Sequence, residues 1–308
     1  MLHYLVSHCG PLAQLGARHT GSVEVVGSSP ICSIKRFFQE EIMAEAGVVK
    51  TNGFEMEYFK FGTGDNIFVI IPGLTVQSLM GLKDSVEEAY GNLADNFTVY
   101  VFERRKVVPK DYTICDMADD TAAVMKELGL KDTYVFGASQ GGMIAQVIAV
   151  RYPELVKKLA LGSTSSHVHP DQRTVIDKWI DLALKGDRHG LYQEFGKEIY
   201  PAAVYEQCKD QLDAAADTVT DEELHKFIIL ARSIRDFNIS DELDKISCPV
   251  LVLGAYEDPV LDDDATMEIA EKLDGNTDLS LYMYKGFGHA AFDTAPDYKQ
   301  RVLDFFLK

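Results

Sequence analysis

The chain has 308 residues, of which 46% are hydrophobic and 25% are charged, a composition typical of a soluble globular protein. Its 30 basic and 48 acidic residues give a formal net charge of −18. This charge argues against nucleic acid or an anionic membrane as a partner, because both bind cationic surfaces. The length fits one large α/β domain with an insertion, or two smaller domains.

The cysteines point to a reducing compartment. The five of them are scattered at positions 9, 32, 115, 208 and 248 without a C-x-x-C pair, so neither a disulfide framework nor a zinc site is predicted. No run of about 18 apolar residues, the length that a membrane span needs, occurs in the chain. We therefore expect a cytoplasmic protein without a membrane span.

Residues 1–42 differ from the rest of the chain. They lack the basic start and apolar stretch of a signal peptide, and they show no sustained helical or strand period. The run at 12–31, LAQLGARHTGSVEVVGSSPI, resembles translated transfer-RNA gene sequence. Our hypothesis is that 1–42 is an upstream extension of the gene model and that the functional protein begins at Met43. The alternative is a genuine flexible tail, which mass spectrometry of the native N-terminus would detect.

Strands and helices alternate after Met43. The stretch at 54–61 alternates apolar and polar residues and predicts an exposed antiparallel strand, whereas 66–71 is continuously apolar, as in a sheet covered on both faces. Further strands are predicted at 98–102, 133–136, 158–161, 249–253 and 279–284. Helices are predicted at 78–92, 116–128, 143–152, 262–273 and 296–307. This alternation predicts an α/β fold with a mostly parallel sheet flanked by helices.

The strand signal disappears between residues 167 and 240. Helical patterns at 173–185, 190–199, 204–216 and 221–235 predict a helical cap inserted into a core made of 43–166 and 241–308. Six aromatic residues of this segment are interpreted mainly as the cap's own core, with a pocket lining as the alternative. They are Trp179, Tyr192, Phe195, Tyr200, Tyr205 and Phe227.

A glycine-rich turn, GASQGG at 137–142, lies between a predicted buried strand and a helix. A G-x-S-x-G pattern in this context is typical of a nucleophilic serine. The small residues around it allow a strained serine whose hydroxyl points above the sheet edge, and the helix start offers N–H groups to a negative charge. Ser139 is therefore placed to attack, provided that a base reaches it. The alternative is a turn whose glycines serve close packing alone.

Two later segments supply partners for this serine. Asp258 follows one buried strand and His289 follows the last strand. Because the carboxyl ends of parallel strands meet at one edge of a sheet, we expect Ser139, Asp258 and His289 to lie close together. Glu257 and the aspartates at 262–264 lie nearby and are alternatives for the acid.

Serine, acid and histidine in this order resemble the α/β-hydrolase fold family. The resemblance covers about 53–308 and rests on GASQGG, on GAYEDPV at 254–260 and on GFGHAAFD at 286–293. It implies that Ser139 is the nucleophile, that His289 acts as general base and then as acid, and that Asp258 orients the histidine.

The family also needs an oxyanion hole made of two N–H donors. Gln140, the residue after the serine, is expected to give one. The other should come from the loop after 66–71, where relatives commonly carry His-Gly and this chain has Pro-Gly-Leu. Leu74 is the candidate there, with Thr75 as the alternative. A second departure is FERRK at 102–106, where many relatives carry Asp-x-Arg-Gly-x-Gly.

No cofactor or metal is predicted. Gly286, Gly288 and Ala291 match part of a dinucleotide fingerprint, but too little chain follows them for a βαβ unit. His167 and His169 are interpreted as a solvated pair in the loop that enters the cap.

These features predict a serine hydrolase, most simply a carboxylic ester hydrolase. It would cleave an ester, thioester or amide of a small molecule with an apolar acyl portion through an acyl-enzyme. Alternatives are a carbon–carbon bond hydrolase or an acyltransferase using the same triad, or a non-catalytic ligand-binding member of the fold. The substrate and the oligomeric state stay open.

Overall fold

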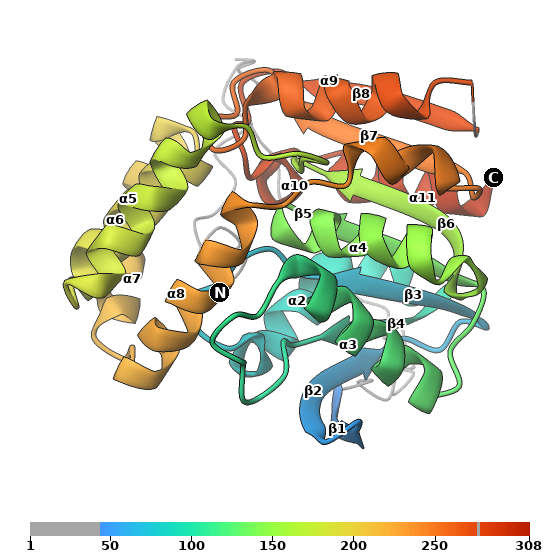
Figure 1. Cartoon of the computed structure of the whole chain (residues 1–308), viewed down its shortest axis with the longest axis horizontal. Coiled ribbons are helices and arrows are strands. Elements are labelled where there is room, and N and C mark those ends of the chain that lie inside the picture. Colours follow the sequence, from blue (N-terminus) through green and yellow to red (C-terminus); the bar gives the residue numbers. More distant parts are fainter. Residues whose placement is uncertain (1–43, 276–277) are drawn as a thin grey trace, which may run out of the picture.

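The computed structural model describes residues 44–275 and 278–308, and the expectations for 1–42 and for a start at Met43 lie outside them. One eight-stranded sheet runs through the molecule in the order β1-β2-β4-β3-β5-β6-β7-β8 (Figure 1). From β4 to β8 all neighbouring strands are parallel, and only β1 and β2 run antiparallel to their neighbours. The strands are β1 (Glu45–Thr51), β2 (Phe54–Phe61), β3 (Asn66–Ile71), β4 (Phe97–Phe102), β5 (Thr133–Ala138), β6 (Val156–Gly162), β7 (Val250–Ala255) and β8 (Leu279–Tyr284).

The expectation of an exposed strand at 54–61 was wrong in one respect. β2 is antiparallel, but it lies inside the sheet between β1 and β4, with Met56 and Phe59 fully buried. β1 was not predicted at all. Asn52 and Gly53, with φ values of 47° and 79°, join β1 to β2 in a two-residue turn, and Asn-Gly is a strong hairpin signal.

Helices cover both faces of the sheet and create two hydrophobic cores. On one face α3 (Ile114–Glu127), α4 (Gln140–Arg151) and α9 (Asp262–Leu273) pack on side chains such as Val135. On the other face α11 (Tyr298–Leu307) packs on side chains such as Phe136. Successive strand residues therefore point to opposite cores, which explains the continuously apolar strands. The short helices are η1 (Leu79–Leu82), α2 (Lys83–Tyr90), η2 (Gly91–Leu93), η3 (Pro153–Leu155), η4 (Pro170–Arg173), η5 (Ser240–Lys245) and α10 (Ala291–Thr294).

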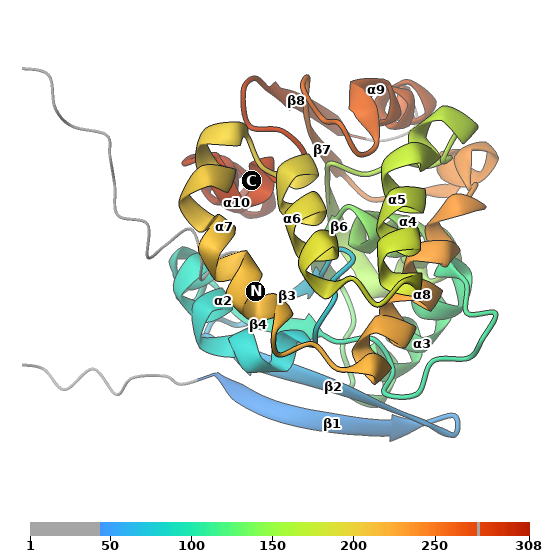
Figure 2. The ribbon, with the colours of Figure 1, turned by 90° about the vertical axis from the view of Figure 1, so that its left-hand side faces the viewer.

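Residues 167–240, here called the insertion, hold four α-helices beside the sheet (Figure 1), and Figure 2 looks onto them. They are α5 (Thr174–Leu184), α6 (Arg188–Ile199), α7 (Ala202–Ala216) and α8 (Asp221–Arg235). The segments that enter and leave the insertion pair with each other: Val168 N–H donates to Phe237 O and Ile239 N–H donates to Ser166 O. The insertion therefore joins the core through two adjacent connectors.

Candidate active site

Ser139 lies between β5 and α4 with φ 53° and ψ −124°, a conformation that a non-glycine residue rarely adopts. Neighbouring groups hold it there. Its N–H donates to Gly162 O at 2.8 Å, and the Thr164 hydroxyl donates to its carbonyl at 2.7 Å. Both partners lie at the carboxyl end of β6 or just beyond it, so the adjacent strand fixes the strained serine.

Two glycines of the turn are required by close packing. A Cβ on Gly141 would lie 2.0 Å from Ile71 O, and a Cβ on Gly137 would lie 2.3 Å from Gly141 O. The first turn of α4 therefore packs directly against the end of β3. This contact explains the glycine pattern and brings the loop after β3 next to the serine.

Asp258 and His289 form a buried pair. Their exposed fractions are 6% and 3%, and Asp258 Oδ2 lies 2.8 Å from His289 Nδ1. Asp258 Oδ1 accepts from the N–H groups of Val260 at 2.8 Å and Leu261 at 3.2 Å. Because a carboxylate only accepts hydrogen bonds, Nδ1 carries the ring proton and Nε2 is left to take another.

Two of the other acids near this position, Glu257 and Asp262, have different partners. Glu257 Oε2 accepts from Gly286 N–H at 2.6 Å, and Asp262 accepts from the side chain of Gln172 and from Ala265 N–H. Among the described residues, the carboxylate that contacts His289 is that of Asp258. The geometry thus distinguishes the acids that the sequence left open, while the catalytic role of Asp258 stays a prediction.

Ser139 and His289 line one cavity of about 150 Å³. Most of the lining is apolar and comes from both the core and the insertion, including Trp179 and Phe195. All six aromatic residues singled out from the sequence belong to the hydrophobic core, so Trp179 and Phe195 contribute to both the core and the cavity lining. Within the described part of the chain, no hydrogen bond joins Ser139 Oγ to the His289 ring. Such bonds often tighten only when substrate is bound.

The two expected oxyanion donors belong to segments that lie next to the serine. A Cβ on Gly73 would lie 3.3 Å from Ser139 Cβ, and Leu74 and Thr75 line the cavity. Gln140 is the first residue of α4, where backbone N–H groups have no acceptor within the helix. Both segments are therefore close to the serine, and the donor roles of Leu74 and Gln140 stay predictions.

Arg104, which sequence reasoning did not single out, connects these two segments. Its side chain is buried, and Nη2 donates to Pro72 O at 2.6 Å and to Gln140 Oε1 at 3.3 Å. Gln140 Nε2 in turn donates to Leu230 O of α8 at 2.8 Å. Burial lowers the pKa of the Arg104 guanidinium, and the charge of Glu103 opposes that shift. The sequence did contain a signal for this residue, because Glu103 and Arg104 are two charged residues directly after the buried strand β4.

No helix in the described ranges is long and apolar enough to cross a membrane. Outside the cavity, His167, His169 and Glu268 bring three potential metal ligands together.

Sequence comparisons agree with this architecture. A family model described as alpha/beta hydrolase fold matches residues 102–190. A protein of Agrobacterium fabrum named "Putative carbamate hydrolase RutD" is 27% identical over 224 residues, which are 70% of this chain and 85% of the relative. "Serine hydrolase BPHL" of Mus musculus is 21% identical over 229 residues, covering 69% of this chain and 70% of the relative.

Solved structures share the fold at low identity. An α/β-hydrolase enzyme from a deep-sea metagenome library, MGS-M2, superposes with a TM-score of 0.75 at 21% identity, covering 85% of this chain and 98% of its own. The enol-lactonase of Burkholderia xenovorans gives 0.73 at 18% identity, covering 85% and 100%. Together, the family model, the relatives and the sheet show that the chain has the α/β-hydrolase fold and is an enzyme of that fold.

Proposed function

We propose that this α/β-hydrolase is a serine hydrolase that cleaves an ester, thioester or amide of a small molecule through an acyl-enzyme. The observation that carries the proposal is the buried His289–Asp258 pair, whose histidine lines the same cavity as a strained Ser139 at the end of β5. A serine hydroxyl is a weak nucleophile unless a base takes its proton and a third group orients that base.

In the proposed reaction Ser139 Oγ attacks the substrate carbonyl carbon while His289 Nε2 takes the hydroxyl proton. Asp258 holds the ring and stabilises its positive charge. The N–H groups of Leu74 and Gln140 receive the oxyanion. His289 then protonates the leaving group, which departs. In the second half His289 activates a water molecule, which attacks the acyl carbon and releases the acid and free Ser139.

The cavity supports a small substrate with an apolar acyl portion. Its lining is mostly aliphatic and aromatic, with Ile176, Trp179 and Phe195 contributed by the insertion. We therefore interpret the insertion as a cap that shapes the acyl site. The RutD relative is named for carbamate hydrolysis. Since a carbamate carbonyl is open to the same attack, carbamates belong among the test substrates beside esters.

Labelling with a fluorophosphonate probe tests the nucleophile. We expect the wild-type protein to be labelled at Ser139, the Ser139→Ala variant to lose labelling, and the control Ser280→Ala, at an exposed residue of β8, to retain it. A folded wild-type protein that never reacts would contradict the proposal and favour the non-catalytic ligand-binding alternative.

A series of p-nitrophenyl esters tests the reaction. We expect short acyl chains to be hydrolysed faster than long ones, because the cavity is small, at about 150 Å³, and is lined by bulky side chains. A protein that labels at Ser139 but turns over neither esters nor carbamates of any length would favour the carbon–carbon hydrolase or acyltransferase alternative.

A further inference from the structure

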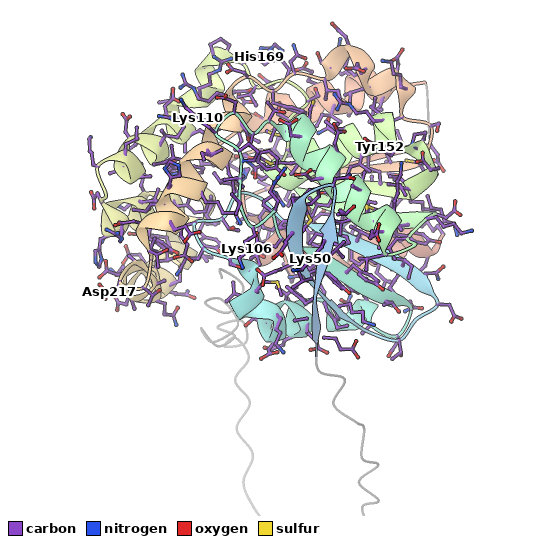
Figure 3. The ribbon with its side chains drawn as sticks, turned by 60° about the horizontal axis from the view of Figure 1, so that its bottom comes forward. Lys50, Lys106, Lys110, Tyr152, His169 and Asp217 are labelled. Carbon is purple, nitrogen blue, oxygen red and sulfur yellow. The ribbon has the colours of Figure 1, made fainter. Side chains whose placement is uncertain are left out.

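Three side chains with metal-binding donors meet outside the cavity, at the edge of the insertion. His167, His169 and Glu268 each offer one ligand atom, and these three atoms lie within 4.8 Å of one another. His169 Nε2 lies 3.1 Å from Glu268 Oε2, and the two imidazole rings are 4.1 Å apart between centroids. All three residues are partly exposed, and Figure 3 shows His169 at the periphery of the molecule.

The cluster joins two parts of the chain that are far apart in sequence. His167 and His169 lie at the start of the insertion, shortly after β6, whereas Glu268 lies on α9 of the core. His167 also pairs with Asn238 on the segment that leaves the insertion. The three ligands therefore lie where both connectors of the insertion meet the core.

Backbone contacts fix the histidine segment at this place. Ser165 Oγ accepts from His167 N–H at 3.0 Å, and Gln172 Oε1 accepts from His169 N–H at 2.9 Å. Gln172 Nε2 also donates to Leu261 O at 3.0 Å, just before α9. Because these hydrogen bonds fix the backbone of both histidines, ordering the two imidazoles around an ion costs less conformational entropy.

The donor set indicates which ion would bind. Two imidazole nitrogens and one carboxylate oxygen suit Zn²⁺, Ni²⁺ or Cu²⁺, whereas Mg²⁺ and Ca²⁺ prefer oxygen ligands alone. Three protein ligands of this kind leave a fourth tetrahedral position for water. An isolated histidine pair is a weak signal in sequence, and Glu268 becomes a neighbour of the pair only through the fold.

We propose that His167, His169 and Glu268 bind a divalent transition metal ion, with Zn²⁺ as the probe of choice, and that the bound ion fastens the start of the insertion to α9. The site is separate from the serine cavity and does not depend on the serine chemistry. The ion would link the connectors of the insertion to a helix of the core and would thereby stabilise the contact between them.

Isothermal titration of the full chain with Zn²⁺ tests the site, with Mg²⁺ as the control ion. We expect His169→Ala to weaken the affinity of this site by at least about tenfold, and His225→Ala, at an exposed histidine of α8, to leave it unchanged. Histidines elsewhere, including those in residues 1–43, are the same in wild type and His169→Ala, so they do not contribute to the difference in Zn²⁺ affinity between these two proteins. Equal Zn²⁺ binding by wild type and His169→Ala would overturn the proposal.

Thermal unfolding gives a second, independent measurement. Since Zn²⁺ binding to the folded state stabilises it, the Tm of wild type should rise with Zn²⁺, and Glu268→Gln should reduce that rise. Glutamine keeps the size of the side chain and an acceptor for His169, so this variant remains informative if His169→Ala fails to fold. A rise that is the same in wild type and Glu268→Gln would count against Glu268 as a ligand.

Discussion

Two adjacent carboxylates act on the histidine segment in different ways. Asp258 contacts the His289 ring, whereas Glu257 contacts the backbone N–H of Gly286. The proposed mechanism needs an acceptor at Nδ1 that holds the ring in one tautomer and stabilises its cation. At the backbone N–H any acceptor is sufficient. Conversion of each acid to its amide should therefore separate the two roles.

We expect Asp258→Asn to lower kcat by about 10³- to 10⁴-fold, because an amide can donate to the ring and favour the wrong tautomer. Glu257→Gln should keep kcat within a few fold, since its amide oxygen still accepts from Gly286. Steady-state kinetics with the best p-nitrophenyl ester would measure both. A larger loss in Glu257→Gln than in Asp258→Asn would reverse the assignment of the acid.

Arg104 is a positioning residue in this scheme, because its guanidinium contacts Pro72 O and Gln140 Oε1 rather than the reacting atoms. Arg104→Met removes both hydrogen bonds and frees the two segments that carry the expected oxyanion donors. Loss of one such donor costs about 10²- to 10³-fold in other serine hydrolases. We expect a smaller loss of about 10- to 100-fold in kcat with little change in KM.

The control for Arg104→Met is Lys106→Met, two residues along the chain at an exposed position, which should leave kcat unchanged. Arg104→Lys should recover part of the loss by restoring one donor. Circular dichroism would show that each variant is folded. If Arg104→Met raised KM at constant kcat, the residue would support substrate binding instead of the transition state.

At the level of elements, periodicity and turn chemistry predicted most of the fold. The strands β2, β3 and β8 and the helices α8 and α9 have the expected bounds. β1 was missed, although Asn52-Gly53 signals its hairpin. The predicted single helix at 78–92 is three short helices, the first of them started by the Ser78 side chain, which accepts from Met80 N–H.

Part of the candidate site was readable from the sequence, because its residues follow strand ends that topology brings together. Arg104 was not, since its partners lie 32 and 36 residues away, and its contacts depend on how three loops pack. The same holds for Glu268, which meets His169 only across 99 residues. Side-chain contacts between distant segments are fixed by packing, which no local pattern encodes.

The close packing of α4 against β3 gives a stability prediction for this element. Gly141→Ala places a Cβ about 2 Å from Ile71 O, so backbone must move, and we expect the free energy of unfolding to fall by at least about 1–3 kcal/mol. Gly91→Ala is the matched control, because its φ of −56° suits alanine and no atom lies within 4 Å of the added Cβ. It should be neutral or stabilise by up to about 1 kcal/mol.

Urea denaturation of both variants would measure these differences. Both variants add the same methyl group, at Gly141 against other atoms and at Gly91 into open space. The difference between their free energies of unfolding is therefore the decisive result. Equal stability of Gly141→Ala and Gly91→Ala would contradict the close approach of α4 to β3.

At the scale of the whole molecule, the insertion and the α/β part of the chain are joined by one of the two hydrophobic cores. Ile176 and Trp179 of α5 belong to the same buried cluster as Met143 and Ile144 of α4. Hydrogen bonds also cross between the two parts: Gln140 donates to Leu230 O at 2.8 Å, and Ala290 N–H donates to Ile199 O at 2.9 Å. A shared core of this kind favours cooperative unfolding over separate melting of the insertion.

The single tryptophan of the chain makes this testable. Trp179 lies in the insertion, is 3% exposed and packs on Phe195 at 4.4 Å between ring centroids. Its fluorescence therefore reports on the insertion. Far-UV circular dichroism, by contrast, reports on all helices of the molecule. We expect the two urea transitions to coincide, and Gly141→Ala, a change in the core, to shift both midpoints equally. A fluorescence midpoint at lower urea than the dichroism midpoint would mean that the insertion opens while the sheet stays folded.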